Sequence, residues 1–81
     1  MAPRIETHGR FAVYIDTHDH GPPHVHVMHG RANLRVYLDD VNPPEAVRGK
    51  WRQADVRKIA AFIRSRREAY LRRWFEIDPR V

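Results

Sequence analysis

The residues with the clearest chemical capacity lie in the stretch DHGPPHVHV, which begins at Asp19. It contains His20, His24 and His26, half of the six histidines in the chain. Side chains two residues apart on a strand point to the same side, about 6.6 Å apart along it, which allows two imidazoles to meet one ion. We therefore expect a candidate site for a divalent transition metal such as zinc on these three histidines, with Asp19 or Asp16 as a fourth ligand or as a group that orients a ligand.

The same histidines also permit catalysis on a phosphodiester without a metal. One imidazole would remove a proton while another supplies one, because an unperturbed pKa of about 6.5 populates both forms near neutrality. Arg35 would stabilise the developing negative charge, and Tyr37 or Tyr14 would donate a hydrogen bond. RNA is the more natural substrate, since its 2′-hydroxyl is an internal nucleophile. The catalytic candidates are His20, His24, His26, Arg35 and Tyr37.

A third interpretation is structural. Imidazoles beside Pro22 and Pro23 would cap the loop and satisfy buried carbonyl groups without any catalysis. No standard motif decides among the three, because the chain has no glycine-rich phosphate loop, no paired-carboxylate helix and no Gly-x-Ser-x-Gly nucleophile turn. All three interpretations stay open at the level of the sequence.

Strands must position these side chains, and the two-residue alternation of apolar residues predicts them. The expected strands, with turns at His8-Gly9 and Gly30-Arg31, are 4–7, 10–16, 24–29 and 32–38, with a brief one at 46–48. One face of this sheet would be apolar and covered by a helix: Phe11, Val13, Ile15, Val25, Val27, Leu34, Val36 and Leu38. The opposite face would collect the polar side chains: Tyr14, Asp16, His24, His26, Arg35 and Tyr37.

The rest of the chain is predicted to be helical. Apolar residues at helical spacing run from Val56 to Trp74, which favours one long helix over about 53–77 that ends at Asp78-Pro79. We therefore expect a single α+β domain over residues 1–81. Its antiparallel sheet, of three to four strands over about 4–48, would pack against this C-terminal helix. The helix end that carries Trp74 and Phe75 either overhangs so small a domain, where a homo-oligomer could form through these two residues, or packs on the N-terminal strand, which is the favoured alternative.

The positive charge of the chain is concentrated in the predicted helix. Residues 52–76 contain eight basic and three acidic residues, which accounts for the whole net charge of +5. A basic surface of this kind is compatible with an anionic partner, and we expect nucleic acid to contact it. The candidate contacts are Arg57, Lys58, Arg64 and Arg72. A solvated arginine-rich helix face explains the same charge. A helix-turn-helix regulator is not expected, because no positioning helix precedes this one.

Several classes of protein are disfavoured by composition. The chain has no cysteine, so disulfide frameworks, thiolate nucleophiles and cysteine-ligated zinc fingers are excluded. Its start, MAPRIETHGR, lacks the apolar segment of a secretory signal, and its uninterrupted apolar runs are too short to span a bilayer. The expected localisation is therefore cytoplasmic, with no membrane partner.

The residues around the histidines also resemble a known family. The stretch from Tyr14 to Val27, YIDTHDHGPPHVHV, resembles the signature of the small bacterial family of domain of unknown function 4160, in which Asp-His is followed by Pro-Pro-His-x-His-Val. The likeness continues through residues 32–38 and the helix to Trp74-Phe75-Glu76. Carried over to this chain, the motif positions are Asp19, His20, Pro22, Pro23, His24 and His26. His18 departs from the pattern, because the family more often has a small polar residue such as Asn there, and this leaves open which imidazole is the third functional group.

The resemblance implies a setting more than an activity. Members are similar to toxin–antitoxin components in size and are often encoded beside another small family, domain of unknown function 2442, which implies a cognate, antitoxin-like partner protein. We therefore expect a toxin–antitoxin-type module that acts on RNA through its histidine-bearing sheet face. If the module is an enzyme, we expect a ribonuclease-like phosphodiesterase. The alternative is a non-catalytic metal-binding or protein-interaction module that uses His20, His24 and His26.

Overall fold

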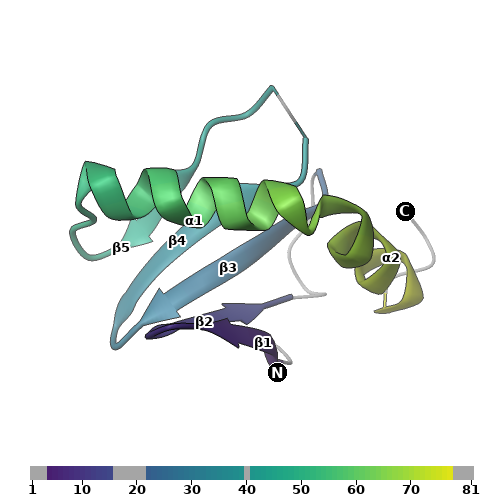
Figure 1. The fold of residues 1–81 in the computed structure, drawn as a ribbon, viewed down its shortest axis with the longest axis horizontal. Helices are drawn as coiled ribbons and strands as arrows, with labels where there is room; N and C mark the ends of the chain where they lie inside the picture. Colours follow the sequence, from purple (N-terminus) through teal and green to yellow (C-terminus); the bar gives the residue numbers. More distant parts are fainter. Residues whose placement is uncertain (1–3, 16–21, 40, 78–81) are drawn as a thin grey trace.

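The structure, a computed structural model, describes residues 4–15, 22–39 and 41–77 of the chain (Figure 1). Five strands form one antiparallel sheet in which each strand pairs with the next along the chain. Two helices follow the sheet. The elements are β1 (Arg4–His8), β2 (Phe11–Tyr14), β3 (His24–His29), β4 (Ala32–Tyr37), β5 (Glu45–Arg48), α1 (Gln53–Ser65) and α2 (Arg67–Ile77). The α+β class is confirmed, and the sheet has five strands rather than three to four, because the brief strand expected at 46–48 pairs with it as β5.

Two tight hairpins set the register of the sheet. His8 pairs with Phe11 and His29 pairs with Ala32, so each hairpin has a loop of two residues that begins with glycine. Gly9 and Gly30 have φ angles of 60° and 62°, a conformation that a two-residue loop with glycine in its first position requires. Both turns predicted from the sequence are therefore present, and they fix which residues of β3 and β4 lie opposite one another.

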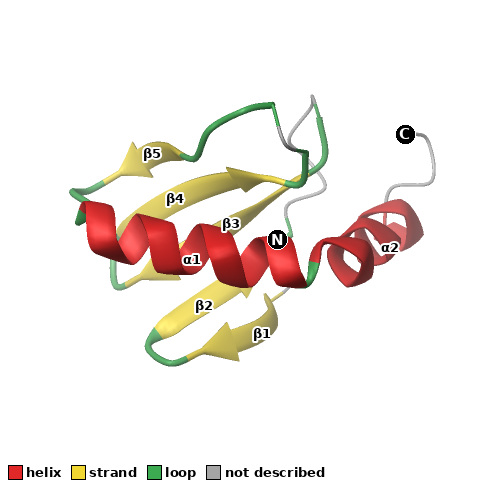
Figure 2. Cartoon of the chain, turned by 45° about the horizontal axis from the view of Figure 1, so that its top comes forward, coloured by secondary structure: helices red, strands yellow, loops and turns green. Residues whose placement is uncertain are grey.

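Helix α1 covers one face of the sheet (Figure 2). The side chains beneath it alternate along three strands, as the apolar pattern predicted, and α1 adds Ile59 and Ile63 to them. Each of these aliphatic side chains contributes roughly 1.5 to 3 kcal/mol when it is fully buried. The buried strand residues are Val13, Ile15, Val25, Val27, Leu34, Val36 and Leu38, while Phe11 is only half-buried.

The predicted single helix is interrupted at Arg66. The Ser65 hydroxyl donates to the Phe62 carbonyl at 2.6 Å, and that carbonyl is the regular helical acceptor for the Arg66 N–H. The Arg66 N–H instead bonds the Ile63 carbonyl at 3.0 Å, and Arg66 adopts φ −112° and ψ 16°. The chain therefore changes direction between α1 and α2. An unbroken helix over 53–77 would be roughly 37 Å long, more than the 34 Å longest dimension of the domain.

The change of direction brings α2 back onto the sheet. Tyr70 and Trp74 are buried, and the Tyr70 hydroxyl donates to a carboxylate oxygen of Glu6 on β1. Burial raises the pKa of Tyr70, and the hydrogen bond to Glu6 raises it further. Arg66 forms an ion pair with the same carboxylate at 3.1 Å. Of the two alternatives for this helix end, packing on the domain is the one that Trp74 adopts, because the residue is 1% exposed, whereas Phe75 is 44% exposed.

Candidate functional site

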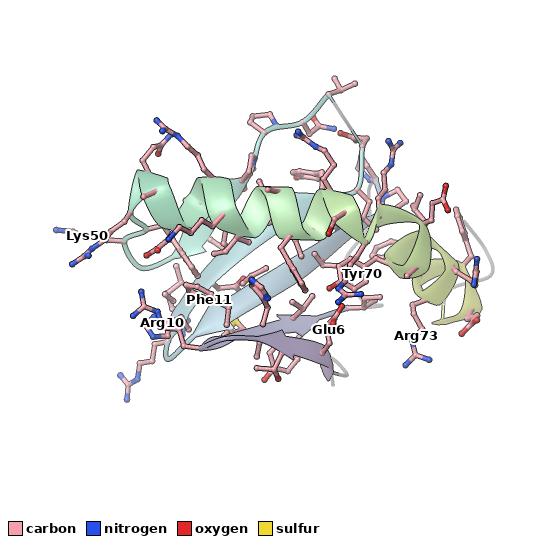
Figure 3. All side chains as sticks on the ribbon, in the orientation of Figure 1. Glu6, Arg10, Phe11, Lys50, Tyr70 and Arg73 are labelled. Atoms are coloured by element: carbon pink, nitrogen blue, oxygen red, sulfur yellow. The ribbon has the colours of Figure 1, made fainter. Side chains whose placement is uncertain are left out.

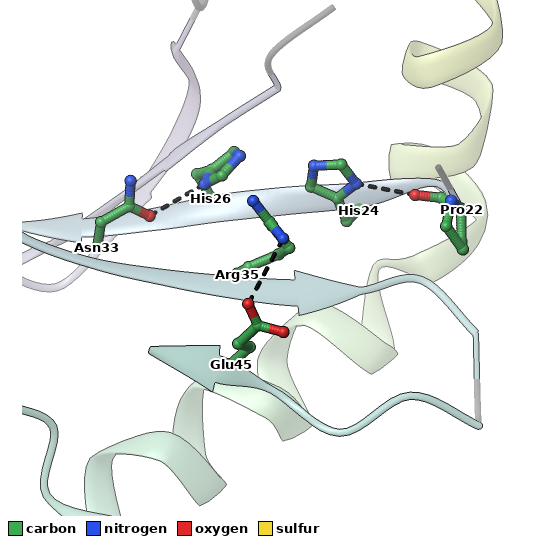
Figure 4. A network of polar contacts seen from close by, with 6 residues as sticks. All are labelled: Pro22, His24, His26, Asn33, Arg35 and Glu45. Atoms are coloured by element: carbon green, nitrogen blue, oxygen red, sulfur yellow. Dashed lines mark hydrogen bonds and ion pairs between the residues drawn. The ribbon is translucent and has the colours of Figure 1, made fainter. Parts of the chain in front are cut away.

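The polar face of the sheet lies on the side away from α1 (Figure 4). His26 on β3 lies opposite Tyr14 on β2 and opposite Arg35 on β4. His24 lies opposite Tyr37. The hairpin register therefore places four of the five predicted catalytic residues side by side on adjacent strands, as expected from their parity. We refer to His24, His26, Arg35 and Tyr37 as the histidine face.

Both imidazoles of the histidine face are held through Nδ1. His24 Nδ1 lies 2.8 Å from the Pro22 carbonyl oxygen, and His26 Nδ1 lies 3.0 Å from Oδ1 of Asn33 (Figure 4). A carbonyl oxygen only accepts, so each Nδ1 donates and a neutral ring carries its lone pair on Nε2. The structural interpretation predicted such bonds, with histidines that satisfy carbonyl groups near the two prolines.

The two rings are also enclosed by neighbouring side chains. His24 is 2% exposed and His26 is 8% exposed. The His24 ring makes an edge contact with His26 at a centroid distance of 5.2 Å, and it packs on Trp74 at 5.2 Å and Tyr37 at 5.7 Å. A general acid or base must come within hydrogen-bonding reach of its substrate. In this conformation the packing around His24 does not leave room for a phosphodiester beside the ring.

Arg35 has an ionic partner on the same face. Its guanidinium lies 3.6 Å from a carboxylate oxygen of Glu45 on β5, and the two side chains are 26% and 59% exposed. The Glu45 carboxylate offsets part of the positive charge that was expected to stabilise a phosphate. This pairing reduces the attraction of the histidine face for an anion.

The predicted metal site is described only in part. His20, Asp19 and Asp16 lie outside the described residues, and so does His18. Among residues 4–15, 22–39 and 41–77, no group of three or more His, Cys, Asp or Glu side chains is arranged to hold a metal ion. Within the described chain, two imidazoles are therefore the whole of the candidate ligand set.

The helices carry a second candidate site of a different kind. The predicted nucleic-acid contacts Arg57, Lys58, Arg64 and Arg72 are all exposed. None of the four forms an ion pair with a carboxylate in the part of the chain that the structure describes. We call these four residues the basic face.

The break between the helices joins two parts of the basic face. Arg64 on α1 and Arg72 on α2 line one open depression of about 660 Å³. Arg66 and Arg67 line it as well, and Glu68 is its only acidic residue among those described. A groove rich in guanidinium groups suits phosphate, because each planar guanidinium can donate two parallel hydrogen bonds to phosphate oxygens.

Two residues of the candidate sites, Asn33 and Trp51, were not predicted from the sequence. Asn33 holds the His26 ring, and the two-residue hairpin would have revealed it, since Asn33 pairs with Met28, which shares a face with His26. Trp51 lies in a basic setting between Lys50 and Arg52. An aromatic residue among basic residues is a signal of nucleic-acid binding, and it could have been read from the sequence.

No helix among the described residues is long and apolar enough to cross a membrane. Comparison with curated proteins and with solved structures found no match. A family model described as a domain of unknown function, DUF4160, matches residues 10–75, which is most of the chain. The match includes β2, β3, β4, β5 and α1, together with most of α2. The chain therefore belongs to the DUF4160 family.

Proposed function

We propose that this domain binds RNA through the basic face of its two helices. The setting of this proposal is the toxin–antitoxin-type module that the family resemblance implies, with a small protein as cognate partner. The observation that carries the proposal is the placement of Arg64 and Arg72, from two different helices, in one open depression without ion pairs to described carboxylates.

Other arginines of the domain, in contrast to these, are paired with carboxylates. Arg10, Arg35, Arg66 and Arg73 all form ion pairs, with Asp55, Glu45, Glu6 and Glu76 respectively. Exposed pairs of this kind contribute little to stability, but they offset the charge that a phosphate would meet. The cations of the basic face keep their full charge for an anionic ligand. Counterions released from a nucleic acid then supply much of the binding free energy.

The arrangement of α1 favours RNA over base-specific recognition of DNA. α1 packs on the sheet through Ile59 and Ile63, and strands rather than a positioning helix precede it among the described residues, so it lacks the arrangement of a helix-turn-helix recognition helix. Its exposed side can contact the phosphates of an RNA strand or an A-form helix, where recognition depends on shape and backbone. The burial of His24 and His26 favours binding without cleavage. The histidine face is then a scaffold that fixes β3 beneath the helices.

The proposal is tested by the salt dependence of RNA binding. Affinity for a fluorescently labelled RNA is measured by anisotropy from about 50 to 200 mM salt, for the wild type and for Arg64→Gln/Arg72→Gln. Each lost phosphate contact lowers the slope of log affinity against log salt by about 0.7 to 0.9, so the double variant is expected to lose about twice that.

The matched control is Arg73→Gln, another exposed arginine of α2, whose guanidinium is already paired with Glu76 at 3.7 Å. It is expected to bind RNA with nearly the wild-type affinity and slope. An unchanged affinity and slope in the Arg64→Gln/Arg72→Gln variant, or no RNA binding by the wild type, would overturn the proposal.

Metal binding is a second candidate, favoured by the bonds at Nδ1. Imidazoles that ligate a metal usually donate their other ring N–H to a carbonyl or carboxylate, which fixes the tautomer with Nε2 toward the metal. His24 and His26 make such bonds to Pro22 and Asn33. Two neutral imidazoles with Nε2 lone pairs are suitable ligands for zinc.

This candidate is tested by the metal content of protein purified without an affinity tag. About one zinc per chain, lost in His26→Ala but kept in His29→Ala, would support a metal site on the histidine face. His29 is the matched control because it lies on the same strand and is exposed. Protein without bound metal, whose folding and RNA affinity do not respond to added zinc, would exclude it.

A further inference from the structure

A cleft of about 240 Å³ lies at the hairpin end of the sheet, away from the break between the helices. Three segments far apart in the sequence meet there: the β1–β2 turn, the end of β3 with the start of β4, and the start of α1. Figure 3 shows Arg10, Phe11 and Lys50 gathered at this end of the domain, far from Arg73. The cleft is smaller than the roughly 300 to 1,000 Å³ of a drug-sized ligand site, which suits a single flat ring.

Two fixed aromatic rings contribute to the walls of this cleft. Trp51 and Phe11 are both half-buried, with ring centroids 6.1 Å apart and planes at 34°. The Trp51 indole N–H donates to the Arg48 carbonyl at 3.3 Å, which limits rotation of the ring. The Phe11 ring is held by an edge contact with the His29 ring, at a centroid distance of 5.5 Å. Aromatic rings held in this way lose little entropy when another ring stacks on them.

The charge at the cleft is positive. Arg10 is paired with Asp55 at 3.6 Å, which leaves Lys50 and Arg52 as exposed cations without an ion pair to any described carboxylate. These two residues flank Trp51 in the chain and line the same cleft. A ligand with one aromatic ring and an adjoining anionic group matches this combination of ring faces and cations.

The backbone holds these residues in place by a close approach at Gly49. Gly49 has a φ angle of 82°, and a Cβ built on it would lie 2.9 Å from Cβ of Ala32. Only glycine permits both the conformation and the contact. The segment that contains Lys50 and Trp51 is therefore pressed against the β3–β4 hairpin.

We propose that this cleft binds one unpaired nucleobase together with its phosphate, so that the RNA ligand is single-stranded. The inference rests on the proposed RNA binding and adds a second contact point to it. In a duplex the faces of the bases are covered by their neighbours, and only an unpaired base can stack on Trp51. The basic face would hold the backbone while the cleft selects unpaired strands.

The first experiment compares a labelled ten-nucleotide single-stranded RNA with a ten-base-pair duplex RNA. Removing one stacking residue costs about tenfold or more in affinity. Trp51→Leu is expected to weaken single-strand binding about tenfold and to leave duplex binding unchanged. Trp51→Phe, which keeps a flat ring, should recover most of the loss. Phe75→Leu, which removes an exposed aromatic residue elsewhere, is the matched control and should bind both RNAs as the wild type does.

The second experiment separates the cleft from the basic face. Adenosine monophosphate is added to the wild type and to Arg64→Gln/Arg72→Gln, and indole fluorescence is followed. Quenching in both proteins that is weakened in Lys50→Gln/Arg52→Gln, a variant that removes two cations of the cleft but keeps the Trp51 indole, supports the cleft whatever the affinity for RNA. Wild-type RNA binding with equal single-strand affinity in Trp51→Leu would overturn the cleft and leave the proposed function standing. No quenching by millimolar adenosine monophosphate would also overturn it.

Discussion

The histidine face and the basic face both carry charged or polar groups, but the fold treats them in opposite ways. His24 and His26 are hydrogen-bonded at Nδ1 and buried among aromatic and strand side chains. Arg57 and Arg64, by contrast, extend from α1 into solvent without a described ionic partner. A buried polar group lowers the free energy of the fold only when its hydrogen bonds are made, so the bonds at Nδ1 of His24 and His26 stabilise the fold.

This difference shows that the chemical capacity of a side chain and its accessibility to a ligand are separate properties. Histidine is the residue type most often used for proton transfer, which made the histidine face the stronger candidate from sequence. Arginines on a helix are common on any solvated surface and carried the weaker signal. The tertiary structure favours the opposite ranking for a nucleic-acid ligand, because the arginines are exposed and the packing of Tyr37 and Trp74 around His24 leaves no room for a phosphodiester beside the ring.

The largest expected effect tests whether Trp74 closes the histidine face. Trp74→Ala is expected to lower the free energy of unfolding by about 3 to 5 kcal/mol, because it leaves a cavity beside His24. Urea denaturation followed by circular dichroism measures it. Trp74→Phe should lose less, since the indole N–H has no hydrogen-bond partner among the described residues. Phe75→Ala should change stability by only about 0.5 kcal/mol, and an equal loss in both alanine variants would contradict the comparison.

The next effect tests the bond at His24. His24→Ala is expected to cost about 1 to 3 kcal/mol, because it removes a buried ring together with the hydrogen bond that the ring donates to the Pro22 carbonyl. His29→Ala, on the exposed end of the same strand, should cost less than about 1 kcal/mol. Thermal unfolding of the two variants gives the comparison. If His24→Ala were as stable as the wild type but lost an RNA-dependent activity, the catalytic interpretation of the histidine face would return.

A smaller effect tests the hydrogen bond that holds α2, the helix that carries Trp74 and Arg72, against β1. Tyr70→Phe removes the hydrogen bond to Glu6 and is expected to cost about 0.5 to 1.5 kcal/mol near neutral pH. The pKa of Tyr70 is raised in the folded protein, so its stabilising contribution is complete below the unfolded value of 10.0 and is lost as pH rises above it. The stability difference between wild type and variant should therefore shrink above pH 10. A difference that stays constant to higher pH would show that the hydroxyl is not held by Glu6.

The smallest effect concerns the stability of the basic face. Arg57→Gln and Arg64→Gln are each expected to change the free energy of unfolding by no more than about 0.5 kcal/mol, because both side chains are exposed and make no described ion pair. Urea denaturation of the two variants beside the wild type measures this. A loss above about 1 kcal/mol would mean that these arginines are structural, and the contrast between the two regions would fail.

Much of the sheet could be predicted because its causes are local. Gly9 and Gly30 mark two-residue turns, and the alternation of Val25 and Val27 with His24 and His26 assigns the two faces of β3. With the register fixed by the turn, His26 had to lie opposite Arg35 and His24 opposite Tyr37. The neighbours of the histidines therefore followed from the sequence alone.

The surroundings of those residues were decided only in three dimensions. Helical periodicity continues through Ser65, so no local pattern showed that its hydroxyl would bond the Phe62 carbonyl and that the helix would turn there. That turn brings Trp74 onto His24 and places Arg64 and Arg72 around one depression. The cleft at Trp51 depends in the same way on Phe11 and His29, which are distant in the chain. The sequence determined which faces the side chains occupy, because the period of a strand is local. The tertiary structure decided which faces are covered, because burial depends on where remote segments pack.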